Sequence, residues 1–189
     1  MQAIERPSFN NVSNRLQAGS YNCAQPSPMD NECVFSRDRR HRYTLIHRPD
    51  PLLGGGRLLM WIGLNPSTAD ENQLDPTLRR ILGYTLREGY DGFIMTNLFA
   101  WRATLPEDMK AAKDPVGPEN DRWLVECARR CDKVVAAWGS HGTHLGRDAH
   151  TVKLLRDFNF VCLARNANGS PGHPLYLKKD PPLVPFSAG

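Results

Sequence analysis

The residues best suited to chemistry stand at the ends of four short apolar segments. These segments span residues 58–63, 92–97, 133–138 and 159–164, and the polar residues at or beyond their ends are Asn65, Asn97, Ser140 with His141, and His173. Taken singly, the two asparagines fit turn or strand-end caps, and the last histidine fits a surface loop. Taken together they indicate one site, because ligands of parallel sheets bind at the carboxyl ends of the strands.

The same four segments predict the sheet that would position these residues. None of them alternates apolar with polar residues, which is typical of strands buried on both faces. A helix is expected to open at Asp75, with Pro76 in its first turn, and to close at Gly89; two more fall within 118–132 and 146–158. We therefore expect an α/β fold, a three-layer α/β/α sandwich with a central, mostly parallel four-stranded sheet.

The residues before this core are expected to be an appendage of one domain that spans 1–189. Residues 1–32 are polar and predict an irregular arm, residues 33–48 predict a small basic hairpin, and the core covers 58–179. The arginines of the hairpin include Arg39, Arg40 and Arg42. They indicate either a solvated edge hairpin or a surface that contacts phosphates.

Composition limits the classes of protein that fit. The 189-residue chain is 40% hydrophobic and 23% charged with a net charge of +4, which fits a soluble globular protein and is compatible with a polyanionic partner. No apolar run is long enough to cross a membrane, and the first residues lack the apolar core of a signal peptide. The five cysteines form no CxxC pair, which favours free thiols in the cytoplasm and a packing role for Cys127 and Cys131.

Motifs of several other enzyme classes are missing from the sequence. It contains no P-loop and no G-x-G-x-x-G, which argues against binding of a nucleoside triphosphate or a dinucleotide. Ser140, His141 and His144 lack the G-x-S-x-G elbow that a hydrolase triad of this kind needs. We expect a monomer that uses no metal and no cofactor.

Four pieces of the chain, in this order, resemble the uracil-DNA glycosylase superfamily. They read GLNPS (63–67), IMTNLFAWRAT (94–104), VVAAWGSHG (134–142) and HPLY (173–176), and the similarity extends roughly over 58–179. The whole chain also resembles an uncharacterised bacterial and phage family with NPSTAD, DPVGPEND and HPLYL signatures. The first resemblance implies a monofunctional DNA glycosylase, which hydrolyses the N-glycosidic bond of a flipped-out pyrimidine and leaves an abasic site. No lysine stands at the matched positions, so a Schiff-base lyase step is not expected.

The resemblance also assigns roles to individual side chains. Asn65 would orient the attacking water through its carbonyl oxygen, and because an amide cannot ionise, we expect slower chemistry than an aspartate would give. His173, as a neutral imidazole, would donate to the pyrimidine O2 as negative charge develops there. Asn97 would pair with the edge of the base, and Gly63 and Ser67 would complete the base-binding surface.

The size of Ser67 is a departure from the uracil-specific branch, which has a bulky tyrosine at this place. A small residue leaves room beside C5 of the base, so the sequence predicts a 5-substituted pyrimidine. Candidates are thymine in a mismatch, a hydroxymethylated pyrimidine and a larger, hypermodified phage base. The aromatic residue that would stack on the base is not assigned: Phe99 and Trp101 are remote candidates, and Tyr84 fits the helix core better.

The expected partner is double-stranded DNA with one base flipped out. Leu175 and Tyr176 would supply an apolar wedge, whereas the residues expected to contact phosphates are Lys178, Lys179, Ser140, His141 and the three hairpin arginines. In the plainer interpretation, the Leu-Tyr-Leu segment packs on the core and the two lysines are solvated.

Two other functions remain open at this point. The first is a non-catalytic reader of modified bases, which would bind such DNA without cleaving it. The second is a hydrolase of free nucleosides or nucleotides. The last option would not need the basic residues, so binding to duplex DNA that weakens steeply with salt argues against it. DNA repair and antiviral defence are both compatible with the proposed activity.

Overall fold

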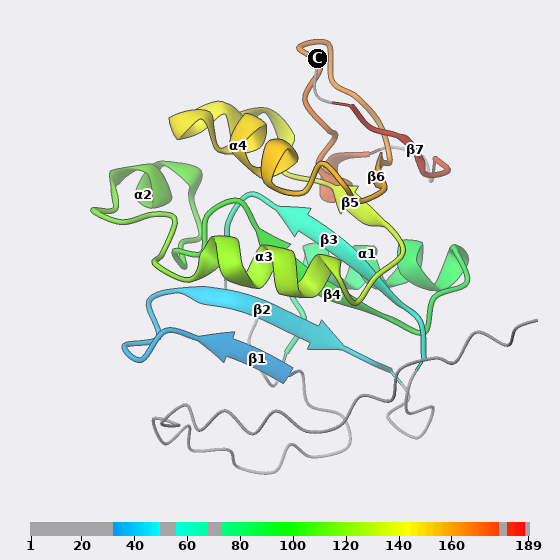
Figure 1. Ribbon diagram of the computed structural model, residues 1–189, viewed down its shortest axis with the longest axis horizontal. Coiled ribbons are helices and arrows are strands. Elements are labelled where there is room, and N and C mark those ends of the chain that lie inside the picture. Colours follow the sequence, from blue (N-terminus) through cyan, green and yellow to red (C-terminus); the bar gives the residue numbers. More distant parts are fainter. Residues whose placement is uncertain (1–31, 50–55, 68–72, 178–180, 188–189) are drawn as a thin grey trace, which may run out of the picture.

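One mixed sheet forms the centre of the protein (Figure 1). The computed structural model describes residues 32–49, 56–67, 73–177 and 181–187, so the expected arm, apart from Glu32, lies outside the described residues. The sheet has seven strands in the order β1-β2-β4-β3-β5-β6-β7. Their bounds are β1 (Glu32–Phe35), β2 (Arg42–His47), β3 (Leu58–Gly63), β4 (Gly92–Asn97), β5 (Val134–Ala136), β6 (Phe160–Cys162) and β7 (Val184–Pro185).

The four apolar segments form the parallel centre of this sheet, as the sequence predicts. β3 pairs in parallel with β4 on one side and with β5 on the other, and β5 pairs in parallel with β6. The expected limit of four strands is wrong, because β2 of the hairpin pairs antiparallel with β4 and β7 pairs antiparallel with β6. These additions satisfy backbone groups that the edges of a four-stranded sheet would leave unpaired.

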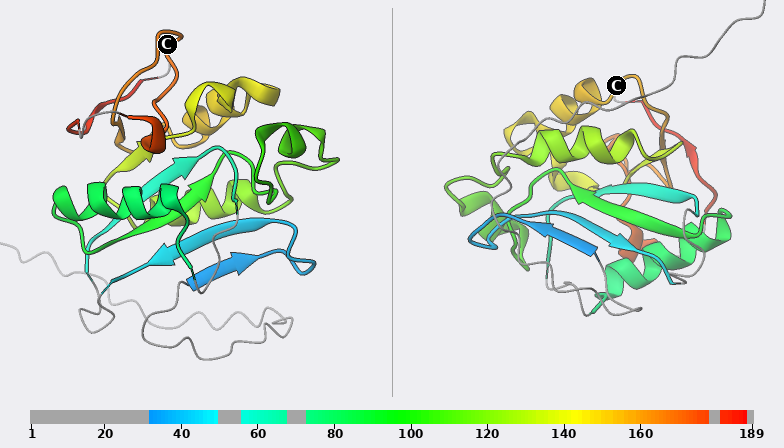
Figure 2. Two further views of the ribbon diagram at one scale, coloured as in Figure 1. Left: turned by 180° about the vertical axis from the view of Figure 1, so that it is seen from behind. Right: turned by 60° about the horizontal axis from the view of Figure 1, so that its bottom comes forward.

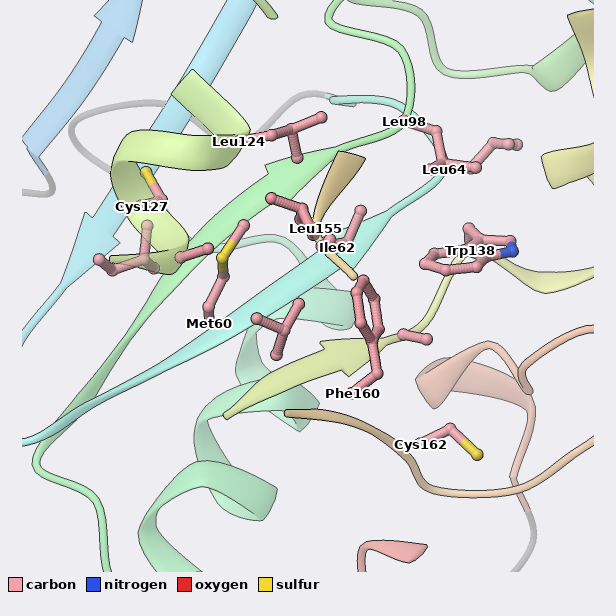
Figure 3. Close-up of a cluster of buried hydrophobic side chains, with 14 of the residues drawn as sticks. Met60, Ile62, Leu64, Leu98, Leu124, Cys127, Trp138, Leu155, Phe160 and Cys162 are labelled. Carbon is pink, nitrogen blue, oxygen red and sulfur yellow. The ribbon is translucent and has the colours of Figure 1, made fainter. Parts of the chain in front are cut away.

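Helices cover both faces of the sheet, which gives the expected three layers. They are α1 (Pro76–Arg87), α2 (Pro106–Ala111), α3 (Asn120–Ala128) and α4 (Arg147–Leu154), with two 3₁₀ segments, η1 (Gly139–Gly146) and η2 (Pro174–Tyr176). α1 packs against one face and α3 lies on the other, as Figure 1 and the left view of Figure 2 show from opposite sides. Alternate residues of β3 therefore enter different clusters: Trp61 packs with Ile81 of α1, whereas Met60 packs with Leu124 of α3 (Figure 3).

The start and end of α1 follow the sequence signals. The Asp75 carboxylate accepts a hydrogen bond from the Leu78 N–H at 2.9 Å, and Pro76 occupies the first turn. Gly89 follows the helix with φ +77°, a left-handed conformation that glycine adopts without strain. The sequence did not predict α2 or the two 3₁₀ segments, which are short and lack an apolar stripe long enough to register as a helix.

Cys127, Cys131 and Cys162 are free thiols that pack in the core. Burial raises the pKa of Cys127 to about 12 and that of Cys131 to about 11, so both thiols stay protonated at neutral pH. No three His, Cys, Asp or Glu side chains in the described residues are grouped so that they could hold a metal ion. None of the described helices is long and apolar enough to span a membrane.

The connections out of β3 create a crevice at its carboxyl end. The chain leaves β3 through α1 to reach β4 on one side, and later reaches β5, on the other side of β3, after α3 on the opposite face. In open α/β sheets, such a reversal of strand order marks the place where ligands bind. The residues after β3 and β5 border this crevice.

Candidate functional site

A cavity of about 830 Å³ opens at the carboxyl ends of the central strands. Its volume is typical of a small-molecule site. The structure brings ten of the sequence-predicted site residues to its wall: Arg42, Gly63, Asn65, Ser67, Asn97, Ser140, His141, His173, Leu175 and Tyr176. The convergence expected from the strand ends is therefore confirmed.

Asn65 is held with its side-chain oxygen available as an acceptor. Its Nδ2 donates to the carbonyl of Ala103 at 2.7 Å and to that of Pro66 at 3.1 Å. Both amide protons are thereby used, and within the described residues no group donates to its Oδ1. The loop itself is fixed by backbone bonds to the segment after β4, such as Ala103 N–H to Pro66 carbonyl at 2.9 Å. Asn65 can therefore act at the cavity only as a hydrogen-bond acceptor.

Asn97 lines the same cavity and is only 1% exposed. Neither its Oδ1 nor its Nδ2 has a hydrogen-bond partner among the described residues. An unsatisfied buried polar group costs roughly 1–3 kcal/mol of folding free energy. A ligand that hydrogen-bonds to the Asn97 amide would remove this cost. Gly63 makes this placement possible, because a Cβ at this position would lie 2.8 Å from the Asn97 Oδ1.

Two buried residues that the sequence did not single out hold the end of β4. The Nδ2 of Asn120 donates to the carbonyls of Asn97 and Leu98, both at 3.0 Å. Arg147 donates from Nε to the same Leu98 carbonyl at 3.1 Å and pairs with Asp121 at 2.7 Å. The DPVGPEND signature, which ends at Asp121, thus supports the strand that carries the unsatisfied amide. The signature itself was visible in the sequence, but its partner strand was not.

Replacing Asn120 with alanine should lower the free energy of unfolding by roughly 1–3 kcal/mol, because the Asn97 carbonyl loses its side-chain donor and the Leu98 carbonyl keeps only Arg147. Chemical denaturation of both proteins measures this change. Asp157→Ala is the matched control: its side chain is 86% exposed, and its contact with Arg156 at 3.8 Å is a surface pair. We expect less than about 0.5 kcal/mol there. Equal stability of Asn120→Ala and the wild type would contradict the support role.

His173 presents its Nε2–H as a donor. The backbone N–H of Leu175 donates to the His173 Nδ1 at 3.3 Å, so Nδ1 carries no proton in the neutral ring and Nε2 does. Burial lowers the pKa of His173 below its ordinary value, and the Asp75 carboxylate opposes this more weakly. The ring is therefore neutral at pH 7. Tyr176 packs on it with a centroid separation of 5.0 Å.

The lowered pKa of His173 makes folding sensitive to acid. In the window between that pKa and the ordinary value of 6.5, the unfolded chain binds more protons than the folded one, so stability falls as pH falls. We expect the difference in free energy of unfolding between the wild type and His173→Gln to be constant above neutral pH. Below pH 6.5 the wild type should lose stability relative to the variant. Denaturation at a series of pH values measures it, and a difference independent of pH would contradict a partly buried, neutral ring.

Other residues complete the wall of the cavity. Asp75 and Trp138 line the cavity. Phe99 and Trp101, the remote candidates for base stacking, do not fit that role, because Phe99 is fully buried in the core and Trp101 packs edge-on against His41. The aromatic residues that do line the cavity are Trp138, which is buried, and Tyr176, which is 78% exposed.

The basic hairpin lies beside the segment that leads to the cavity. Arg102 N–H bonds to the Arg40 carbonyl at 2.9 Å, and the guanidinium groups of Arg39 and Arg102 both stack on the Phe35 ring, at 3.9 and 5.1 Å from its centroid. Arg39 and Arg40 are exposed, as expected for phosphate contacts. The same expectation is wrong for Arg42, which is 2% exposed and belongs to the cavity wall. A register shift between Val34 and Phe35, opposite Thr44 and Arg42, accompanies this inward placement.

The other residues predicted to contact DNA differ in their exposure to solvent. Leu175 and Tyr176 are exposed by 38% and 78%, so the core does not cover them. The plainer interpretation is confirmed only for Leu177, which packs against the core. Ser140 and His141 are exposed at the rim, where Lys110 Nζ lies 3.1 Å from the His141 Nδ1. Lys178 and Lys179 lie outside the described residues.

Comparison with known proteins gives one match. A family model described as "Protein of unknown function (DUF1643)" matches residues 42–175. This range contains the cavity residues on the central strands and ends inside η2. No curated protein and no solved structure matches the chain.

Proposed function

Because the chain belongs to the DUF1643 family, a family of unknown function, we propose an activity from the cavity itself: the protein is a DNA glycosylase that excises a modified or mispaired pyrimidine. The observation that carries the proposal is the meeting of an acceptor, a neutral donor and an unsatisfied amide in one cavity. These are Asn65, His173 and Asn97. Their capacities match what hydrolysis of an N-glycosidic bond needs at the water, the leaving oxygen and the base edge.

In this reaction a water oxygen forms a bond to C1′ of the deoxyribose as the bond from C1′ to the base N1 breaks. The electron pair of the broken bond leaves with the base, and its negative charge spreads to O2. Asn65 Oδ1 accepts from the water and orients it, while His173 Nε2–H donates to O2 as the charge grows. The water proton passes to solvent, and the departing base is protonated. Because His173 is neutral, it stabilises the anion as a hydrogen-bond donor and not as a counter-charge.

Asn97 would read the base. A base that presents one donor and one acceptor to this amide satisfies both of its unpartnered atoms, which repays the cost of burying them. Ser67 lines the same cavity, and its small side chain is consistent with a substituent at C5. The cavity volume of about 830 Å³ supports a base larger than an unsubstituted pyrimidine.

The surroundings of the cavity favour DNA over a free nucleoside. The exposed arginines of the hairpin lie next to the segment that ends at the rim, where they would neutralise backbone phosphates. Leu175 and Tyr176 stand exposed beside His173, where an apolar wedge would replace the flipped base in the stack. Flipping would bring the target base out of the duplex and into the cavity.

A panel of duplexes that each contain one candidate base tests the proposal. Each is incubated with the full chain and then with alkali, which breaks the strand at an abasic site. We expect cleavage at 5-substituted or mispaired pyrimidines and none in an unmodified duplex. A strict preference for bare uracil would contradict the 5-substituent, although not the activity.

The alternatives give different results in the same assay. Tight, salt-sensitive binding of a modified duplex without alkali-labile sites would identify a reader. Release of base from free nucleosides, with no duplex binding, would identify a nucleoside hydrolase. Either result would overturn the glycosylase proposal.

A further inference from the structure

The two asparagines of the cavity differ in whether their side-chain amides have partners. Asn65 donates from Nδ2 to the carbonyls of Ala103 at 2.7 Å and Pro66 at 3.1 Å, and these bonds determine which end of its amide is the oxygen. Neither end of the Asn97 amide has a hydrogen-bond partner among the described residues, although Asn97 is only 1% exposed. No hydrogen bond therefore fixes the orientation of the Asn97 amide.

The groups beside the Asn97 amide do not distinguish its oxygen from its nitrogen. A Cβ on Gly63 would lie 2.8 Å from Asn97 Oδ1 and 2.5 Å from the Met95 methyl group, so the amide lies over a residue without a side chain and beside an apolar one. Among the described residues of the wall, the charged side chains are Arg42 and Asp75, and neither hydrogen-bonds with the amide. An amide has nearly the same shape in both orientations, so it can turn over in place.

The main chain that carries this amide is fixed. Asn120 donates to the Asn97 carbonyl at 3.0 Å, and the Leu98 N–H donates to the Gly63 carbonyl at 2.9 Å. The amide is therefore held at one place in the cavity wall while its donor and its acceptor remain exchangeable.

A pyrimidine presents one of two patterns along the edge that Asn97 would read. A 4-oxo base, such as uracil or thymine, has the donor N3–H beside the acceptor O4, whereas a 4-amino base, such as cytosine, has the acceptor N3 beside the donor N4–H. One orientation of the amide pairs with the first pattern, and the opposite orientation pairs with the second. The atoms N1 and O2 are common to both classes, so the proposed roles of Asn65 and His173 do not distinguish them either.

We infer that the protein accepts both 4-oxo and 4-amino pyrimidines, because the Asn97 amide turns to match the base that enters. The inference rests on the proposed function and deepens it by naming the substrate class. An amide fixed in one orientation would leave two buried pairs unmade with the wrong base, which would weaken binding roughly 30-fold or more. An amide that turns loses only about two-fold, since about half of the molecules already hold the required orientation.

The test measures affinity, because cleavage rates would also reflect how readily each base leaves. The full chain with Asn65→Ala, which should suppress cleavage, is titrated with two duplexes that differ at one position, with 5-hydroxymethyluracil in one and 5-hydroxymethylcytosine in the other. Each base stands opposite an abasic analogue, so that no base pair has to break before it flips. We expect the two dissociation constants to agree within about ten-fold, and a larger ratio overturns the inference.

Equal affinity would also result if the protein did not read the base, so a second substitution is needed. In the same background, Asn97→Leu should weaken binding of both duplexes by about ten-fold or more. This variant should fold, because it removes a buried group that has no partner among the described residues. Asn97→Ala serves the same purpose if leucine does not fit beside Met95. Unchanged affinity in the Asn97 variants overturns the inference.

The matched control is Asn159→Ala. Asn159 is exposed and directly precedes β6, at the amino ends of the parallel strands and thus away from the cavity. This variant should keep the affinity for both duplexes, whereas an equal loss in Asn159→Ala and Asn97→Ala would overturn the specific role of Asn97.

The outcomes separate this inference from the proposed function. If the two affinities agree and depend on Asn97 but the wild type cleaves neither duplex, the inference stands and the glycosylase fails. If the wild type cleaves either duplex but the affinities differ by more than about ten-fold, the glycosylase stands and the inference fails. If neither duplex binds more tightly than one with adenine at the same position, the inference fails, and the cleavage panel alone decides on the activity.

Discussion

Replacing His173 with alanine is expected to lower kcat for base excision roughly 10²–10³-fold, with little change in affinity for the duplex. The reason is that its Nε2–H serves the leaving oxygen mainly as charge develops, so the loss falls on the transition state and not on binding. The Leu175 N–H that bonds to Nδ1 at 3.3 Å fixes which nitrogen carries the proton. Single-turnover kinetics on a preferred duplex measure the rate constant of the chemical step, in which the loss should appear.

Two further variants control for the loss of a ring. His173→Gln keeps an N–H donor on a flexible side chain and should retain part of the rate that alanine loses. His144→Ala removes a histidine whose ring packs against Phe99 at 5.5 Å, so it should keep the wild-type rate. A wild-type rate in His173→Ala would mean that this side chain does not act in the reaction.

The convergence of this site was predictable because it follows from sheet topology. Apolar runs without alternation indicate parallel strands, and parallel strands deliver their carboxyl ends to one edge. Asn65, Asn97 and His173 could therefore be placed together before any contact was known. Their relative positions came only from the structure: Asn65 follows β3, Asn97 ends the neighbouring β4, and His173 lies near Gly139.

The unsatisfied state of Asn97 was not predictable from the sequence. A buried asparagine usually finds a backbone partner. Asn120, the first residue of α3, does so by donating to the Asn97 and Leu98 carbonyls. That Asn97 itself finds none depends on Gly63 opposite it in the register of β3 and β4. Such a relation between distant segments leaves no local periodic signal.

The prediction that Arg42 lies on the surface was wrong for a similar reason. In the sequence it belongs to a run of arginines, and a run of like charges indicates a solvated surface. The structure pairs the residue before it, His41, with Trp101, and the register of the hairpin shifts beside it. A one-residue shift reverses which side of a strand a residue occupies. The pairing of β2 with β4, which the sequence also missed, is what makes that side a cavity wall.

Replacing Asn65 with aspartate is expected to impair the protein, although a carboxylate is a better general base than an amide. The carboxylate oxygen that takes the place of Nδ2 would face the Ala103 carbonyl at 2.7 Å and the Pro66 carbonyl at 3.1 Å, with no proton between them. We expect a loss of roughly 2–4 kcal/mol in the free energy of unfolding and at least a ten-fold loss in kcat. Asn65→Ala removes the acceptor without this repulsion, so it should lose activity, by roughly 10²–10⁴-fold, but less stability.

The pH dependence of stability in this aspartate variant shows whether its loss of stability comes from repulsion between the new carboxylate and the two carbonyls. Protonation would restore a donor toward the two carbonyls, so the folded state raises the pKa of the new carboxyl group. The stability deficit should therefore shrink as pH falls toward 5, while that of Asn65→Ala should stay nearly constant. Denaturation of both variants between pH 5 and 8 measures the difference. A stable and faster aspartate variant would show that the loop readily turns its amide, and that the hydrogen bonds from Asn65 to Ala103 and Pro66 do not fix the acceptor toward the cavity.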